Sequence, residues 1–390
     1  MEFFSAMIGE TKENTDKAAD GKDHRMMAGA VVRGIAVVLL AAGIAAGTGA
    51  CMNRTTEVTN VEAAEKFESP NAAIRVSAEE EHYIFDLDES VERTHVYYKN
   101  RFGIEIAADL YIAKDAETGK KYPAIIVGPP FGGVKEQGPG VYANQLAQRG
   151  FIVLAIDPAY HGYSGGSSRY TISTTMYAED FSAAVDYLGN RDDVDREKIG
   201  VIGICGSGGF ALSAAAMDDR IKAVVTSVMY DIAGNMNAIS GEERKNMIHM
   251  SGVSRWNSFV TGEYEYMKQY PDAPADRIPD GLDEVNAEFF SFYGMERGWH
   301  PNALGNMNSA SLGDIMTFPS NEHLAELNRP VLFVAGENAH SLGYSQTAYD
   351  NASEPKELYI VPDANHVDLY DHVDKIPFDK IEAFFNDTLK

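Results

Sequence analysis

Hydrophobic residues recur along the chain with two different periods. Between residues 104 and 112 they occupy every second position, which predicts a strand with one buried face. Shorter runs elsewhere are almost wholly apolar, which is typical of strands buried on both faces of a parallel sheet. These runs are residues 124–128, 151–156, 199–204, 222–228 and 331–336. Between two of them, residues 177–188 carry apolar side chains at the i, i+3, i+4, i+7 spacing of an amphipathic helix.

The order of these elements predicts the fold. Residues 94–99 and 104–112 are expected to form an antiparallel hairpin with its turn at residues 100–103. Strands then alternate with helices, so the sequence predicts an α/β protein with a doubly wound, mostly parallel sheet. In such sheets the active site forms at the carboxyl ends of the strands. The residues that directly follow each strand are therefore the first candidates for chemistry.

A nucleophile is predicted directly after the run 199–204. The chain continues as Gly203-Ile204-Cys205-Gly206-Ser207-Gly208-Gly209, the pattern of a nucleophile elbow between a strand and a helix. Cys205 takes the nucleophile position, and Ser207 takes the second small position. Because Cys205 would lie at a helix N-terminus, we expect its thiol pKa to be lowered. The alternative is an inert, buried cysteine beside a glycine-rich turn.

A general base is predicted near the C-terminus. The segment KELYIVPDANHVDLYD places a strand and a short loop before His366. A histidine that serves a nucleophile at the sheet edge is expected on a loop after the last strand. His340, which follows the run 331–336, is its one serious competitor.

These motifs resemble the alpha/beta-hydrolase superfamily over about residues 90–390. The resemblance rests on GICGSGG around Cys205, PDANHVD around His366, and DPAYHGYSGG at residues 157–166. The blocks GPPFGGVKEQ and VPDANHVDLYD are most similar to its dienelactone-hydrolase-like and polyketide-acyltransferase-like branch. The resemblance implies an oxyanion hole with one donor in the backbone N–H of Gly206. The second donor would follow the third strand, where Pro129 and Pro130 lack an N–H, so Phe131 is expected there and Gly132 next.

The third catalytic residue departs from the pattern of this superfamily. The usual position of its aspartate, three residues after Gly336, holds Ala339. Asp231, at the end of the preceding strand, and Glu337, on the same loop, are the two substitutes, and the sequence barely favours Asp231. Asp157 is expected to organise the loop that carries His161 rather than to complete the triad.

An insertion divides the predicted core into residues 91–231 and 329–390. The intervening segment, residues 232–328, is too long for an ordinary loop and contains both tryptophans of the chain. We expect a mainly helical cap over the nucleophile. Its aromatic residues either line an apolar acyl pocket or pack the cap onto the core.

Composition and charge narrow the classes of function. The chain has 390 residues with a formal net charge of −25, and such an acidic surface argues against nucleic-acid binding. Its 2 cysteines, Cys51 and Cys205, exclude a disulfide framework. The sequence contains no metal-ligand cluster, phosphate-binding loop or dinucleotide fingerprint, so no metal or cofactor is expected.

The N-terminal region is predicted to direct export. Residues 34–50 carry no charge, follow Arg33 and precede Cys51, so residues 1–50 read as an export signal or a membrane anchor. The sequence around Cys51 resembles a bacterial lipobox, which implies lipidation of this cysteine and attachment to a membrane. Residues 51–90 are polar and acidic and suit a tether. The expected location is the bacterial cell envelope.

Together these features predict an exported hydrolase or acyltransferase. It would cleave an ester, thioester or lactone through a Cys205–His366–carboxylate mechanism with a covalent acyl-enzyme. The expected partner is a small, partly apolar acyl substrate. A peptidase of the same fold and a non-catalytic, lipid-tethered binding protein are the alternatives.

Overall fold

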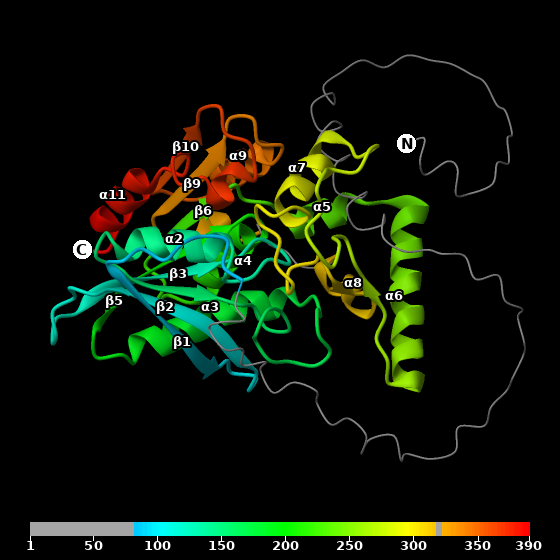
Figure 1. Ribbon diagram of the computed structural model, residues 1–390, viewed down its shortest axis with the longest axis horizontal. Helices are drawn as coiled ribbons and strands as arrows, with labels where there is room; N and C mark the ends of the chain where they lie inside the picture. The colour runs from blue at the N-terminus through cyan, green and yellow to red at the C-terminus, as the bar shows by residue number, and fades with distance from the viewer. Residues whose placement is uncertain (1–81, 317–321) are drawn as a thin grey trace, which may run out of the picture.

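A central sheet of eight strands organises the molecule in the computed structural model, which describes residues 82–316 and 322–390 (Figure 1). The strand order is β1-β2-β4-β3-β5-β6-β9-β10. The first two pairings, β1 with β2 and β2 with β4, are antiparallel, and all later pairings are parallel. The strands are β1 (Val91–Lys99), β2 (Glu105–Ala113), β3 (Tyr122–Gly128), β4 (Ile152–Ile156), β5 (Val194–Ile204), β6 (Ala223–Ser227), β9 (Val331–Gly336) and β10 (Lys356–Val361). The predicted doubly wound, mostly parallel α/β sheet is confirmed.

Strand β2 differs from its predicted pattern. Alternating residues predicted one buried face, yet residues 106–111 are all buried. The second face is covered because Tyr83 and Lys135 pack over it, and both bind the carboxylate of Asp109. The expectation of a half-exposed strand was therefore wrong, since the sequence pattern did not reveal this covering layer.

Helices cover both faces of the sheet. Adjacent side-chain positions on a strand point to opposite faces, and the glycines of β5 show which helix lies on each. A Cβ on Gly200 would lie 2.5 Å from a ring atom of Phe385, whereas one on Gly203 would lie 2.2 Å from the backbone of Ser207. Phe385 belongs to α11 (Phe378–Thr388), which packs beside α2 (Gly138–Ala147). Ser207 belongs to α4 (Gly206–Met217), which packs beside α3 (Thr174–Gly189) on the other face.

The predicted cap segment, residues 232–328, carries a group of helices beyond the sheet (Figure 1). Its elements are α5 (Ile232–Ala238), α6 (Gly241–Thr261), β7 (Tyr266–Met267), α7 (Glu284–Tyr293), β8 (Met307–Asn308), a 3-10 turn (Ser309–Ser311), α8 (Leu312–Ile315) and a second 3-10 turn (Leu324–Glu326). The core resumes at β9, followed by α9 (Leu342–Asn351) and α10 (Asp368–Asp371). Both expected roles of the aromatic residues occur: Tyr270 and Phe289 line a pocket, and Phe292 of α7 packs against Tyr370 of the core with ring centroids 5.1 Å apart. Trp256 on α6 has neither role in these contacts and is 75 % exposed.

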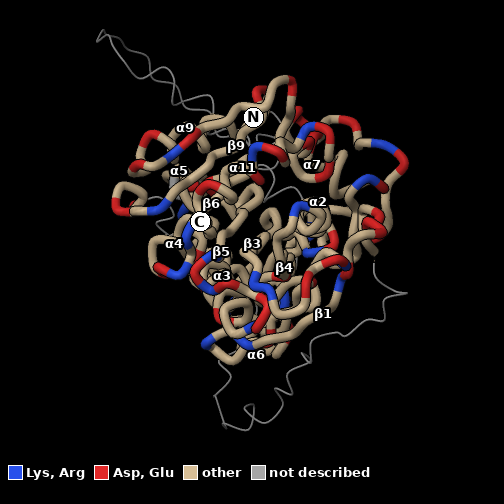
Figure 2. The backbone as a smooth tube through the Cα atoms, turned by 90° about the vertical axis from the view of Figure 1, so that its left-hand side faces the viewer, with Lys and Arg blue, Asp and Glu red and all other residues tan. Residues whose placement is uncertain are grey.

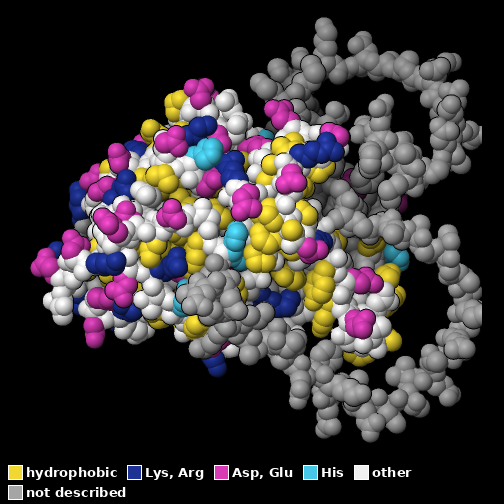
Figure 3. Space-filling model, in the orientation of Figure 1, with side chains coloured by type: hydrophobic (Ala, Val, Ile, Leu, Met, Phe, Trp, Pro, Cys, Tyr) yellow, Lys and Arg dark blue, Asp and Glu magenta, His cyan; other side chains and the backbone are white. Residues whose placement is uncertain are grey.

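The N-terminal predictions fall mainly on undescribed residues. The export signal, Cys51 and residues 51–81 of the expected tether lie outside the described part of the chain. The last residues of that tether contact the core, where Tyr83 donates to Asp109 and Phe85 packs against Gly140. Within residues 82–316 and 322–390, no helix has the length and apolar character needed to cross a membrane. Acidic and basic residues intermingle around the periphery (Figures 2 and 3).

Candidate active site

Cys205 lies on a sharp turn between β5 and α4. Its φ of 53° falls in the left-handed region, which is strained for a residue with a side chain. Only small neighbours permit the turn: a Cβ on Gly203 would clash with the backbone of Ser207, and one on Gly206 would lie 2.9 Å from Phe131 Cβ. The backbone N–H of Cys205 donates to Ser227 O at 2.9 Å, which fixes the turn to β6. The geometry is that of a nucleophile elbow.

Two backbone donors converge on the Cys205 sulfur. The N–H groups of Gly206 and Phe131 both hydrogen-bond to it. Phe131 is held there because Ser207 Oγ donates to Pro129 O and the backbone N–H of Lys135 donates to Asp157 Oδ1 at 2.8 Å. Donors beside an attacking atom are placed to receive the oxygen of a carbonyl group that this atom attacks. The structure thus brings Cys205, Gly206 and Phe131 together.

Burial dominates the electrostatics of this thiol. It raises the pKa of Cys205 to about 11, although hydrogen bonds from Tyr370, Gly206 and Phe131 lower it. The expected lowering of the thiol pKa was wrong, because that argument counted the helix N-terminus but not the loss of solvent. At neutral pH the thiol is protonated, so any attack by the sulfur requires a base.

Alkylation should report this raised thiol pKa. We expect iodoacetamide to modify Cys205 slowly at pH 7, and the rate to rise about tenfold per pH unit until the pH approaches 11. The sign follows from the raised pKa: below it, each unit of pH increases the reactive thiolate fraction. Quantifying the modified Cys205 peptide by mass spectrometry measures the rate. A rate that levels off near pH 7 would instead show a thiolate stabilised at neutral pH.

His366 is connected to Cys205 through a tyrosine. The fully buried ring follows β10, and its Nε2 lies 2.9 Å from the hydroxyl of Tyr370. The same hydroxyl hydrogen-bonds to the Cys205 sulfur. On the other side of the ring, Nδ1 lies 2.6 Å from Ser341 Oγ. Burial holds the pKa of His366 well below its usual value, and the nearby His340 lowers it further. The ring is therefore neutral, with a lone pair on one nitrogen that can accept a proton.

Tyr370 and Ser341 were not found from the sequence. Tyr370 stands four residues after His366, but α10 begins only at Asp368, so the two residues do not share a helix and the spacing gave no signal. Ser341 lies just before α9, two residues after Ala339, and gave no signal because serine is common at such helix starts.

The two predicted carboxylates lie elsewhere. Asp231 caps α5 by accepting the backbone N–H of Gly234 at 2.8 Å. Glu337 accepts the backbone N–H of Asp363 at 3.1 Å. The nitrogens of His366 are instead engaged by Ser341 and Tyr370. The expected role of Asp157 is confirmed, because its Oδ2 accepts the N–H of Tyr163 in the loop after His161.

A carboxylate from the cap approaches the histidine loop by another route. Glu288 on α7 lies 3.2 Å from His340 Nδ1, and its second oxygen accepts the N–H of Val367 at 2.9 Å. The His340 ring in turn lies over the His366 ring, with centroids 4.5 Å apart. His340, the competing candidate, is thus a direct neighbour of His366. The carboxylate of Glu288 lies beside the loop that carries His366, where an imidazolium would form.

Single substitutions separate these candidates. We expect Ser341→Ala to lower kcat for acyl transfer by about 10-fold to 100-fold, because Nδ1 loses its partner and the ring its fixed tautomer. Asp231→Asn and Glu337→Gln should each change kcat by less than about 3-fold, since both side chains bind backbone groups away from His366. Steady-state kinetics on the purified variants measures these effects. A large loss with Asp231→Asn or Glu337→Gln and none with Ser341→Ala would return the role to a carboxylate.

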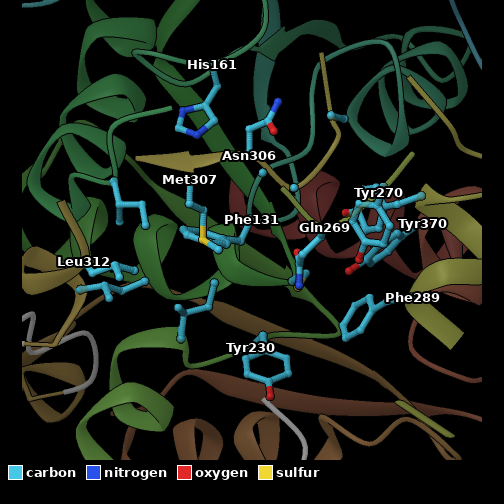
Figure 4. Close-up of a pocket in the computed structure, with 18 residues that line it drawn as sticks. Phe131, His161, Tyr230, Gln269, Tyr270, Phe289, Asn306, Met307, Leu312 and Tyr370 are labelled. Atoms are coloured by element: carbon cyan, nitrogen blue, oxygen red, sulfur yellow. The ribbon is translucent and has the colours of Figure 1, made fainter. Parts of the chain in front are cut away.

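The sulfur opens into a pocket of about 860 Å³, including the part open to solvent (Figure 4). Most of its wall is apolar or aromatic, including Ile172, Ile232, Met307, Leu312, Ile315 and Phe289. Tyr230, Tyr270, Tyr293 and Tyr370 line the part of the pocket near Cys205, and His161, Gln269 and Asn306 are further polar groups of the wall. Within residues 82–316 and 322–390, no group of three His, Cys, Asp or Glu side chains could hold a metal ion.

Comparisons with known proteins identify the family and the fold. The family model of the alpha/beta hydrolase fold matches residues 123–373. The uncharacterized protein PA2218 of Pseudomonas aeruginosa is 44% identical over 314 residues, which cover 78% of this chain and 83% of that protein. Its crystal structure superposes with a TM-score of 0.74 at 43% identity, covering 78% of this chain and 96% of that one. The uncharacterized protein YcjY of Escherichia coli is 34% identical over 73% of this chain and 95% of its own length. The acyltransferase drtE of Aspergillus calidoustus is 24% identical over 72% of this chain and 89% of its own.

Proposed function

The chain belongs to the alpha/beta hydrolase family, and from this premise we propose that it is a hydrolase or acyltransferase with Cys205 as its nucleophile. Its substrates are esters, thioesters or lactones with a partly apolar acyl group. One observation carries the proposal: two backbone N–H groups meet at the sulfur of a residue on a left-handed turn, beneath an apolar pocket. An inert core cysteine needs neither the donors nor the pocket.

The proton of the thiol reaches His366 through Tyr370. The Tyr370 hydroxyl gives its proton to Nε2 while it takes the proton of Sγ, so the tyrosine ends neutral and the histidine becomes an imidazolium. Before this transfer the neutral His366 ring accepts at Nε2 and therefore carries its hydrogen on Nδ1, which donates to Ser341 Oγ. The sulfur then forms a bond to the carbonyl carbon of the substrate. The negative charge of Glu288 near Val367 favours the imidazolium.

The carbonyl oxygen becomes an oxyanion beside Phe131 and Gly206. Each such donor contributes about 3–4 kcal/mol to the lowering of the barrier. When the tetrahedral intermediate collapses, the bond to the leaving group breaks, and that group takes the proton back from His366 through Tyr370. Water, or an alcohol or amine acceptor, then releases the acyl group from the sulfur by the same steps in reverse. Because a thiolate itself leaves easily, activated esters and thioesters suit this nucleophile better than amides do.

One relative supports acyl-transfer chemistry. The relative drtE is named an acyltransferase, and its match covers 72% of this chain. The binding-only alternative gains some support from the replacement of the usual acid by Ser341 and from the protonated thiol.

A panel of substrates tests the proposal against this alternative. The full chain is incubated with p-nitrophenyl esters of increasing acyl length, with thioesters and with lactones. We expect turnover together with an acyl adduct on the Cys205 peptide by mass spectrometry. Ligand binding without turnover or adduct across the panel would identify a binding protein.

We also propose that the protein is exported and tethered to a membrane of the cell envelope through Cys51. The support is the uncharged stretch 34–50 that ends directly before this cysteine. Cys51→Ala should move the protein from the membrane fraction to the soluble fraction, or leave an unprocessed precursor of higher mass. Fractionation and intact-mass measurement of both forms show the outcome. If the variant fractionates unchanged with unchanged mass, the anchor is an ordinary hydrophobic segment.

A further inference from the structure

His161 and Asn306 lie on the pocket wall and have no part in the proposed proton path. We propose that they form a polar subsite for a hydroxyl group on the acyl chain, so that the preferred substrates are hydroxyacyl esters or thioesters. This inference rests on the proposed function and names the substrate class of the same site. It follows from the hydrogen-bonding state of His161, the position of Asn306 and the apolar character of the surrounding wall.

His161 presents a hydrogen-bond acceptor to the pocket. The residue is 3 % exposed, and its Nδ1 lies 3.1 Å from the carbonyl oxygen of Ala159. A carbonyl oxygen can only accept, so Nδ1 carries the hydrogen. Burial lowers the pKa of His161 to about 4, so the ring is neutral at physiological pH and Nε2 has a lone pair without a hydrogen. In the described chain Nε2 has no hydrogen-bond partner, while the ring forms part of the pocket wall.

The ring is held in place by its surroundings. The edges of Tyr170 and Tyr177 pack against it, with centroids 6.0 Å and 5.7 Å away. Asp157 fixes the loop by accepting the N–H of Tyr163, and Gly162 is required there because a Cβ would lie 2.2 Å from the Asp157 carboxylate. Nε2 is thus a fixed acceptor on the pocket wall with no partner among the described residues, so a ligand that donates a hydrogen bond can bind to it there. The arrangement therefore fits a ligand group better than it fits a structural role.

The partner must donate a hydrogen bond and sit among hydrocarbon. A hydroxyl group satisfies both conditions, because it donates to Nε2 of His161 while its oxygen accepts from the Asn306 carboxamide. His161 and Asn306 line the same pocket, and in the view of Figure 4 both are drawn above Met307. The remaining wall is apolar and contacts the rest of the acyl chain through Ile172, Leu312 and Ile315. A carboxylate or ketone offers no donor to Nε2 and would be disfavoured.

Matched thioesters test the subsite. The kcat/KM of the full chain is measured with octanoyl thioester and with positional isomers of hydroxyoctanoyl thioester. We expect kcat/KM for at least one hydroxyoctanoyl isomer to exceed that for the octanoyl thioester by about 10-fold or more, because a site that binds a hydroxyl discriminates against an analogue without one. His161→Leu should remove this preference, so that kcat/KM for the hydroxyacyl thioester falls to about the value for the octanoyl thioester of the same variant. Asn306→Ala, in a partly exposed segment, should also reduce the preference for the hydroxyacyl thioester. Ile315→Val should change kcat/KM for both thioesters alike.

Two results would overturn the subsite. Either no isomer is preferred, or His161→Leu lowers turnover of both substrates equally, which would assign His161 to catalysis or to positioning. Calorimetric binding of the same thioesters to Cys205→Ala, with and without His161→Leu, gives a readout that needs no turnover. A hydroxyl preference in binding without any turnover would remove the proposed function and keep the subsite. Equal affinity for both thioesters would remove the subsite alone.

Discussion

Cys205→Ala is expected to lower kcat for ester or thioester cleavage by about 10⁴-fold or more. The variant lacks the atom that forms the acyl bond, while the donors Phe131 and Gly206 and the pocket stay in place. Residual activity would come from binding and oxyanion stabilisation alone. Burst kinetics with a p-nitrophenyl ester and intact-mass measurement of the acylated protein show the loss. The substrate should still bind, because the sulfur is only one part of the pocket wall.

Ser207 provides the matched control for the identity of the nucleophile. It lies two residues away in the same glycine-rich turn, but its hydroxyl is turned toward Pro129 O and supports the loop of Phe131. Ser207→Ala should lower the rate through this loop and still yield an acyl adduct on Cys205. An adduct that persists in Cys205→Ala and disappears in Ser207→Ala would show that serine is the nucleophile.

Tyr370→Phe is expected to lower kcat by about 10²-fold to 10³-fold, because its hydroxyl bridges the Cys205 sulfur and His366 Nε2. Without it the proton has no continuous path to the base. The loss should shrink as the pH rises toward the thiol pKa of about 11, since an already ionised thiol needs no base. The pH profile of kcat for both forms measures this difference.

Tyr270→Phe is the control for the loss of a tyrosine hydroxyl from the same pocket. Tyr270 is buried and lines the wall, but it hydrogen-bonds to neither Cys205 nor His366 among the interactions of the described residues. Its variant should lose less than about 5-fold in kcat. An equal loss in both variants, with the same pH dependence, would mean that Tyr370 shapes the pocket rather than carries the proton.

Local sequence was sufficient for the sheet and for the elbow. The inner strands of the parallel sheet are buried on both faces, so each of them produced a continuous apolar run that could be recognised without its neighbours. The turn at Cys205 needs glycine at adjacent positions, and this requirement is written into a few consecutive residues. Phe131 was expected because the resemblance to the alpha/beta-hydrolase superfamily implies a donor after the third strand, where Pro129 and Pro130 lack an N–H.

The partners of His366 depend on loops that the sequence separates widely. Ser341 comes from the loop after β9, Tyr370 from α10 and Glu288 from the cap, and a shift of one or two ångströms decides which of them binds the ring. The thiol pKa had the wrong predicted sign for a similar reason: burial is a property of the whole fold, whereas the helix N-terminus is visible locally. The sequence by itself thus determined the sheet and the sharp turn at Cys205, because these follow from short-range patterns of apolar residues and glycines. Only the tertiary structure decided the partners of His366, the direction of the thiol pKa shift and the polar positions in the pocket, because these depend on distances between segments that meet only in the folded chain.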